Sequence, residues 1–408
     1  MTTEHSNGVA PHADADADTN DRLKLFAAGL NAHDQLDSSN DGRDVRAFTS
    51  IIIPDGGQAS EGVRDVLFAG WSTTVLISRT GKLRSLGHQT VGDSEKQRLD
   101  SHSRPVSAFG DHNGLLGFLD LDGGLACCGT TEAAAEGGAA AFTTLTTEAS
   151  PSLSHIALAG NERITVTFKQ APNGRLCHVV AFSDIDGFMA WYSDHSAKGN
   201  YPERHHMLPG RPKQLLANAA TFLLLLEGGE VYSWGDPRHQ SLGRTTHGGD
   251  ATPAEEPGVV EALGGLRISK IASGGWMSAA LSEDGALYLW GGSPPGAEKF
   301  LSRLREAGAG EVTLVELPGD GNEPPDVIDV AVGDAHVVAV TADHRLFVVG
   351  DNKNGQLGLD SAQAFFEDWT EVEALQDVQR VVCGPKASFA FVGAGHGNSA
   401  PNPNRPAT

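Results

Sequence analysis

Two tryptophans closely follow glycines that end short apolar runs. Trp71 comes directly after Gly70, and Trp276 comes two residues after Gly274. Large aromatic side chains supply much of the binding energy in many protein–protein interfaces. If these runs end on one side of the molecule, we predict that Trp71 and Trp276 contact a protein partner there. The alternative is that each ring packs on its own hairpin or on a neighbouring strand.

Polar residues follow glycines at three further places. Asp111, His112 and Asn113 follow Gly110; Asp236, Pro237, Arg238 and His239 follow Gly235; and a similar sequence occupies 351–354. Side chains in such loops can bind a partner, and we include Asp111, His112, Asp236 and Arg238 among the candidate contacts. The alternative is that the Asp and Asn side chains cap their own turns.

Residue types that bind metals or catalyse reactions do not occur at the spacings that such sites require. His205 and His206 are adjacent, and adjacent side chains diverge on an extended chain. No spacing of His, Cys and Asp matches a zinc or calcium loop, and the sequence contains no nucleophile elbow or phosphate-binding loop. We therefore expect a protein without catalytic activity, metal or cofactor.

Cysteine content and charge limit the compartment and the partners. Cys127, Cys128, Cys177 and Cys383 form no C-x-x-C pair, and we expect them to be reduced, buried thiols in the cytoplasm or also the nucleus. The net charge of −22 repels nucleic-acid phosphates and anionic lipid. There is no apolar run of membrane-spanning length and no secretory signal pattern. We expect a monomer that binds protein rather than nucleic acid or membrane.

The elements that position these residues are indicated by a repeat. The sequence Val231-Tyr232-Ser233-Trp234-Gly235 is repeated at 287–291 and, in altered form, at 346–350. Upstream of each such segment lies a short apolar run, which usually ends in glycine. Seven such runs occur, and we call the residue at which each run ends its anchor position. These positions are 70, 110, 160, 218, 274, 333 and 384. A unit recurring about every 50 residues must bury its apolar face against copies of itself, which indicates an array or ring.

Each unit has the same internal order. One short apolar strand ends at the anchor position, a second follows, a turn carries glycine, and a third strand ends in Trp-Gly or a variant of it. We therefore expect Trp191, Trp234 and Trp290 to end third strands and to pack between units. Short strands and glycine turns predict an all-β fold, a seven-bladed β-propeller of four-stranded blades.

The two ends of the chain complement one another. The last unit stops after 389–392 without a third strand, and the segment Leu25–Leu30 has the missing pattern, so we predict that the N- and C-terminal strands pair and close the ring. The sequence Asn31-x-x-x-Gln35-Leu36 echoes Asn352-x-x-x-Gln356-Leu357. We predict one propeller domain over 22–393, with a disordered acidic tail at 1–21 and a disordered tail at 394–408.

Three internal segments depart from this order. The Ala/Gly/Thr-rich segment 130–147 and the proline-containing segment 198–213 are predicted to be long loops. Residues 301–308 (LSRLREAG) are predicted to form one or two helical turns.

The Trp-Gly-Asp-x-x-x-Gly-Gln-Leu-Gly type of motif resembles the regulator of chromosome condensation repeat family of seven-bladed propellers. The matches at 349–359 (VGDNKNGQLGL) and 232–244 (YSWGDPRHQSLGR) carry the resemblance, which extends over roughly 22–393. The family's Gly-x-x-His turn is matched by Gly333-Asp334-Ala335-His336, which adds Asp334 and His336 to the candidate contacts. Thr73, Asn113, Arg163, Thr221, Met277 and Ala387 replace that histidine in the other units.

The resemblance implies several functions. One group of the family binds nucleosomes and acts as a guanine-nucleotide exchange factor on a Ran-type small GTPase. Another consists of small cytosolic propellers of the fungal alpha-tubulin-suppressor type, which partner a small zinc-binding electron carrier in diphthamide synthesis and tRNA wobble-uridine modification. The acidic charge and divergent first half fit the second group, so we expect a protein-binding scaffold with exchange activity as the alternative. A third class, a propeller with an enzymatic or ligand site in its axial channel, would show a deep pocket lined by clustered ionisable residues.

Overall fold

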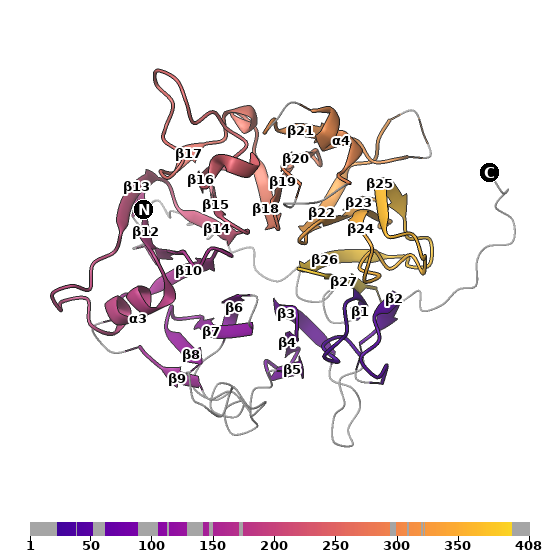
Figure 1. Cartoon of the computed structure of the whole chain (residues 1–408), viewed down its shortest axis with the longest axis horizontal. Helices are drawn as coiled ribbons and strands as arrows, with labels where there is room; N and C mark the ends of the chain where they lie inside the picture. The colour runs from indigo at the N-terminus through magenta and orange to yellow at the C-terminus, as the bar shows by residue number, and fades with distance from the viewer. Residues whose placement is uncertain are drawn as a thin grey trace, which may run out of the picture.

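The computed structural model describes residues 23–37, 39–51, 62–88, 105–111, 114–128, 142–146, 150–170, 174–293, 299–307, 310–319, 321 and 323–393. In this part of the chain, seven antiparallel sheets are arranged around a common axis (Figure 1). Six sheets have four strands, and the first has three among the described residues. The predicted all-β, seven-bladed propeller is therefore confirmed.

The blades follow the chain in order, and each is listed from its innermost strand outward. Blade 1 is β3 (Val63–Ala69), β4 (Thr73–Ser78), β5 (Leu83–Gly87); blade 2 is β6 (Pro105–Asp111), β7 (Gly114–Asp120), β8 (Leu125–Cys128), β9 (Phe142–Thr144); blade 3 is β10 (Leu153–Leu158), β11 (Ile164–Phe168), β12 (Leu176–Phe182), β13 (Arg204–Pro209). Blade 4 is β14 (Pro212–Ala217), β15 (Thr221–Leu226), β16 (Val231–Gly235), β17 (Gly258–Val259); blade 5 is β18 (Ile268–Gly274), β19 (Met277–Ser282), β20 (Leu287–Gly291), β21 (Thr313–Val315). Blade 6 is β22 (Val327–Val332), β23 (His336–Thr341), β24 (Leu346–Asp351), β25 (Phe365–Glu371); blade 7 is β26 (Val378–Gly384), β27 (Ala387–Val392), β1 (Lys24–Gly29), β2 (Val45–Ser50).

The core lies between the blades. The second strand of a blade is covered on both faces by the neighbouring sheets, and therefore β15 (TFLLLL) and β23 (HVVAVT) are buried along their whole length. One apolar cluster joins Leu223 and Val231 of blade 4 to Ile271 and Trp290 of blade 5. Trp290 is fully buried, and its indole N–H donates to the carbonyl of Ser241 at 3.1 Å. Trp234 and Trp290 therefore pack between blades as predicted.

The ring is closed by the two ends of the chain. β1 pairs with β27 over a continuous register that runs from Lys24 opposite Val392 to Gly29 opposite Ala387. Figure 1 shows the N-terminal and C-terminal strands side by side in this blade. The predicted pairing is confirmed. The segments predicted to be disordered tails, 1–21 and 394–408, lie outside the described residues.

The prediction for Trp191 is wrong. Trp191 lies in helix α3 (Ile185–Ser193), which follows the third strand of blade 3. Asp184 caps this helix by accepting from the N–H of Gly187 at 2.7 Å, and Phe188 and Tyr192, one helical turn apart, are both buried. The Trp191 ring instead contacts Phe182 of its own blade, with ring centroids 5.2 Å apart.

The predicted loops and helical turns have different outcomes. Segment 198–213 is not a continuous loop, because its second half forms β13 and enters β14, with two prolines at strand termini. Segment 130–147 lies largely outside the described residues, and its described part includes β9. The turns predicted at 301–308 are confirmed by α4 (Ser302–Glu306). Short 3₁₀ helices η2 (Pro237–His239) and η3 (Glu261–Leu263) complete the elements used below. No helix among the described residues is both long and apolar enough to cross a membrane.

Candidate docking face around the axis

Two kinds of connection share one side of the ring, which we call the loop face. The first and third strands of a blade run parallel to each other, so the turns between first and second strands and the connections between third and fourth strands lie on the same side. Each innermost strand ends within two residues of the anchor position predicted for it. The predicted placement of Trp71 and Trp276 on one face therefore agrees with the strand order.

The turns between first and second strands surround a central hollow of about 390 Å³. All seven blades contribute to its lining, and most of that lining is backbone, glycine and alanine. Neighbouring turns are joined by backbone hydrogen bonds: Gly160 N–H donates to Asn218 at 3.0 Å, and Ala219 N–H donates to Gly275 at 2.9 Å. These hydrogen bonds fix the turns of blades 3, 4 and 5 relative to one another.

Gly275 shows why glycine recurs at these turns. Its φ of +53° lies in the left-handed region, and a Cβ there would lie 1.8 Å from the carbonyl oxygen of Asp334 in the next blade. The turns of blades 5 and 6 therefore approach backbone against backbone, at a distance that a side chain would prevent.

Trp71 is exposed at the mouth of the hollow. Its side chain is 44% exposed, and it lines the hollow together with Asp111 and Asp334. The backbone is held by Gln35, whose side-chain amide donates to the Trp71 carbonyl at 2.7 Å. The ammonium of Lys386 lies 5.8 Å from the Trp71 ring centroid, within the range of a cation–π contact. The structure thus presents an aromatic ring on a restrained turn.

Asp334 brings a carboxyl group to the same mouth. Burial raises the pKa of this carboxyl to about 6, with Asp351 adding to the rise and the positive charge of Lys386 opposing it. The backbone N–H of Asp334 donates to the carbonyl of Pro385 at 3.0 Å, which attaches its turn to blade 7. The pKa of this carboxyl therefore lies closer to neutral pH than that of an exposed aspartate.

A second group of candidates lies around η2, at the border of blades 4 and 5. The Trp276 ring is half-buried and packs against His239, with ring centroids 3.9 Å apart and ring planes tilted by 45°. Asp236 caps η2 through the N–H of Arg238 at 2.9 Å and also pairs with the Arg238 guanidinium. These hydrogen bonds lower the pKa of Asp236. Trp276 therefore packs on a neighbouring blade, and Asp236 caps its own turn, as the alternatives stated above describe.

His336 does not lie on the loop-face surface. Its ring is fully buried, and Nε2 lies 3.1 Å from the hydroxyl of Ser388 in blade 7. Because that hydroxyl donates to the Gln356 carbonyl at 2.7 Å, it accepts from Nε2. Burial lowers the pKa of His336 to about 4. His336 was predicted to contact a partner, but its ring is buried and instead connects blade 6 to blade 7. His112 lies outside the described residues.

The repeated Asn-x-x-x-Gln-Leu sequence is a structural device. In both copies the Asn side chain accepts from the N–H of the Leu, at 2.8 Å for Asn31 and Leu36 and at 3.1 Å for Asn352 and Leu357. The Gln side chain accepts from the N–H two residues before it, at 2.9 Å in each copy. The motif therefore folds the connection after the third strand and sets Gln35 against the turn that carries Trp71.

A belt of polar side chains lies deeper around the axis, and sequence reasoning missed it. Every innermost strand has a register shift between its first and third residues, which is typical of a β-bulge. The third residues are all polar: Asp65, Ser107, His155, Gln214, Lys270, Asp329 and Arg380. The signal that could have found the belt is this shared polarity at one position, although the residue type differs in almost every blade.

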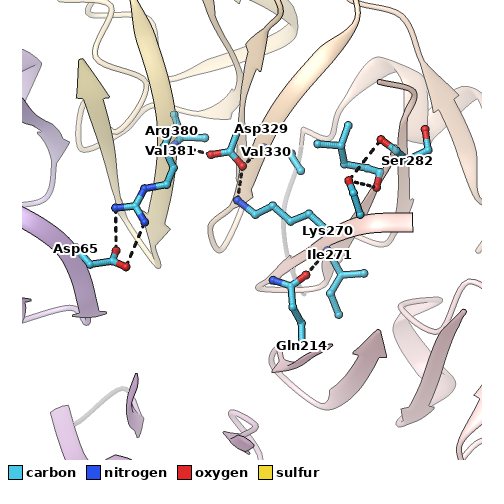
Figure 2. Close-up of polar contacts among 11 residues, drawn as sticks. Asp65, Gln214, Lys270, Ile271, Ser282, Asp329, Val330, Arg380 and Val381 are labelled. Atoms are coloured by element: carbon cyan, nitrogen blue, oxygen red, sulfur yellow. Dashed lines mark hydrogen bonds and ion pairs between the residues drawn. The ribbon is translucent and has the colours of Figure 1, made fainter. Parts of the chain in front are cut away.

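The belt residues of blades 4, 5, 6 and 7 each bind the next blade around the ring (Figure 2). Gln214 accepts from the N–H of Ile271 at 2.8 Å, and Asp329 accepts from the N–H of Val381 at 2.8 Å. Lys270 forms an ion pair with Asp329, and Arg380 forms one with Asp65 at 3.1 Å. Opposite charges thus alternate across blades 5, 6, 7 and 1, which include the blade that closes the ring.

Among the described residues around the axis, the side chains form no constellation typical of catalysis. Lys270, Asp329, Arg380 and Asp65 are paired with one another, and Asp329 also accepts from backbone N–H groups. No group of three or more His, Cys, Asp and Glu side chains is placed to hold a metal ion in the described part of the chain. Burial raises the pKa of the Cys383 thiol, which lines the hollow, to about 12, so it is a poor nucleophile at neutral pH.

Comparison with known proteins agrees with the repeat. The family model described as the regulator of chromosome condensation (RCC1) repeat matches residues 228–281 and 327–356. RCC1 domain-containing protein 1 of Mus musculus is 32% identical over 213 residues, covering 44% of this chain and 55% of that protein. The E3 ubiquitin-protein ligase HERC2 of Homo sapiens is 32% identical over 176 residues, covering 42% of this chain and 3% of that protein. The chain thus spans about half, or far less, of the length of these relatives.

Solved structures show the same fold. Prp20p from Saccharomyces cerevisiae, studied for its binding to Gsp1p and histones, superposes with a TM-score of 0.64 and 18% identity, over 93% of this chain and 95% of that one. Human WBSCR16 superposes with a TM-score of 0.61 and 15% identity, over 90% and 99% of the two chains. From its blades, its turns and these matches, the chain is a seven-bladed propeller that carries regulator of chromosome condensation repeats at 228–281 and 327–356.

Proposed function

We propose that this protein is a non-enzymatic scaffold that docks a protein partner on its loop face, at the mouth of the central hollow. The observation that carries the proposal is Trp71, an exposed tryptophan on a turn whose backbone carbonyl accepts a hydrogen bond from the side chain of Gln35. A large aromatic ring on a rigid support loses little entropy when it is buried in an interface.

Electrostatics favour a partner with basic patches. The chain has a net charge of −22, and Asp111 and Asp334 line the hollow beside Trp71. An acidic surface accelerates encounter with a positively charged partner and does so less at high salt. Association should therefore slow as ionic strength rises, while the dissociation rate changes little.

The partner that we propose is a small zinc-binding electron carrier that serves diphthamide synthesis and tRNA wobble-uridine modification. Its support is the resemblance to the small cytosolic propellers together with the acidic charge, and we propose a cytoplasmic location on the same ground. The test is affinity purification of the full chain from its native cell, followed by mass spectrometry and by measurement of diphthamide in a deletion strain. Recovery of no such carrier, with normal diphthamide, would refute this assignment while leaving the docking face open to another partner.

The second candidate is guanine-nucleotide exchange on a Ran-type small GTPase. The fold similarity to Prp20p, whose binding to Gsp1p has been studied, favours it. The test is release of a labelled nucleotide from the GTPase at micromolar propeller concentrations. Accelerated release would replace the scaffold proposal, and unchanged release would exclude exchange on that GTPase.

A further inference from the structure

A second pocket lies between blades 3 and 4, away from the central hollow. Its volume is about 220 Å³, and it opens on the loop face beside the turn at 161–163 and the start of η2. This volume is smaller than that of a typical pocket for a drug-sized ligand and suits one compact chemical group. Nothing in the docking proposal uses this pocket.

The strand register brings two basic side chains into it. In the β12–β13 pair, Arg204 lies opposite Ala181 and His206 opposite Val179, and all four residues line the pocket. Because side chains alternate along a strand, Arg204 and His206 point toward blade 4, while His205 between them is exposed. Arg163, from the turn between β10 and β11, adds a third basic group.

Two of these groups have polar atoms without a partner. The Nε atom of Arg204 and the Nε2 atom of His206 are buried and form no hydrogen bond within the described part of the chain. A buried arginine N–H without an acceptor costs roughly 1–3 kcal/mol, so the pocket beside Arg204 favours a ligand that accepts hydrogen bonds. Burial also lowers the pKa of His206.

The acidic residues nearby are largely committed elsewhere. Glu203 pairs with Arg163 at 2.9 Å through one guanidinium nitrogen, and Asp236 pairs with Arg238. Glu255 lies at the rim and is exposed, and Glu256 acts on His206 only through its charge. Arg204 therefore remains available to a negative ligand.

Aromatic side chains form the remaining wall. Phe182, Phe222 and Trp234 all line the pocket, and the rings of Phe222 and Trp234 stack with centroids 5.6 Å apart and planes 18° apart. The pocket thus combines basic donors with an apolar wall, a combination that binds an anionic group carried on an apolar body.

We propose that this pocket binds a phosphate monoester on a small aromatic body, with Arg204, His206 and Arg163 donating to the phosphate oxygens. Three donors from one strand and a turn match the several oxygens of a phosphate, and arginine pairs with phosphate through two parallel hydrogen bonds. The aromatic wall contacts the organic part of the ligand. A phosphorylated side chain of a protein and a free metabolite share this chemistry.

The test is isothermal titration calorimetry of the full chain with phenyl phosphate, inorganic phosphate and phenylguanidine. We expect phenyl phosphate to bind more tightly than inorganic phosphate, because only the first reaches the aromatic wall. No phenyl phosphate binding at about 10 mM, the limit of weak specific affinity, would overturn the proposal. Equal binding of inorganic phosphate would overturn the aromatic part, and preferred binding of phenylguanidine would show that Glu255 and Glu256 govern the pocket instead.

Variants connect the binding to the named residues. Arg204→Gln should weaken phenyl phosphate at least about tenfold, the usual effect of losing a charge-assisted hydrogen bond. The matched control is Arg267→Gln, because Arg267 is an exposed arginine in blade 5 that pairs only with Glu283 in the described contacts, and it should bind like wild type. His206→Asn serves if Arg204→Gln unfolds, as judged by its thermal melt. Wild-type affinity in a folded Arg204→Gln or His206→Asn protein contradicts the proposal.

A phosphopeptide then separates the two sources of the ligand. A short peptide with phosphotyrosine should compete with phenyl phosphate if the natural ligand is a modified protein, and its unphosphorylated form should not. If the free ester binds and the phosphopeptide fails to compete, the pocket takes a metabolite.

Discussion

Replacing Asp329 with alanine should destabilise the ring by about 3–5 kcal/mol. Asp329 is 6% exposed and accepts from the backbone of Val330 at 3.0 Å and of Val381 at 2.8 Å, in addition to its ion pair with Lys270. Removing one partner of a buried ion pair typically costs about 3–5 kcal/mol. The two N–H groups that lose their acceptor each add to this cost, while Lys270, with a side chain 30% exposed, recovers some hydration.

Asp65→Ala is the matched control, since Asp65 occupies the same third position of its innermost strand. Its ion pair with Arg380 joins side chains that are 37% and 33% exposed, and an exposed pair contributes only about 0–1 kcal/mol. The measurement is urea unfolding of both variants, with the free energy compared at an unchanged m-value. A cost for Asp329→Ala within about 1 kcal/mol of that for Asp65→Ala would refute the argument that burial in the belt stabilises the ring.

Three further predictions concern the turns and their titratable groups. Gly275→Ala should lower the melting temperature more than Gly265→Ala, because both glycines have positive φ but only at Gly275 would the new Cβ meet backbone atoms. Equal losses of melting temperature would contradict the close approach of the turns. The folded pKa of Asp334, about 6, lies above its unfolded value, so wild type should lose stability relative to Asp334→Asn as pH rises from about 4 to 6. Melting temperatures of the two proteins that change in parallel with pH would contradict the burial of this carboxyl. The folded pKa of His336, about 4, lies below its unfolded value, so wild type should lose stability relative to His336→Gln as pH falls from about 6.5 to 4. If the stability difference between the two proteins does not change over this range, the His336 ring is exposed to solvent rather than buried.

Much of the fold could be predicted because the repeat has local physical causes. The anchor positions mark the ends of the innermost strands, where turns such as the one at Gly275 pack on the next blade without a side chain. The closure could be predicted because 25–30 has the pattern of a third strand that the last unit lacks. Helix α3 was missed because it interrupts one blade, and its apolar pair Phe188 and Tyr192 is too short a signal against seven strand-rich units.

Less of the candidate site could be predicted, because its contacts join distant segments. The exposure of Trp71 follows from its turn, whereas the burial of Trp276 depends on His239 of the preceding blade. His336 follows the family motif, but only the structure shows that its ring bonds Ser388 rather than a partner. The pocket between blades 3 and 4 has no sequence motif, since Arg163 and Arg204 reach it from a turn and a strand of one blade.

The most direct test of the docking face is quantitative capture of native-cell proteins by three forms of the full chain: wild type, Trp71→Ala and Leu121→Ala. Leu121 is 53% exposed and lies in the turn between β7 and β8, on the side of the ring opposite the loop face. A partner recovered by wild type and Leu121→Ala but reduced about tenfold or more with folded Trp71→Ala is the predicted result, which corresponds to the loss of one interface hot spot. Undiminished recovery with Trp71→Ala, or loss with Leu121→Ala alone, would contradict docking at the mouth of the hollow.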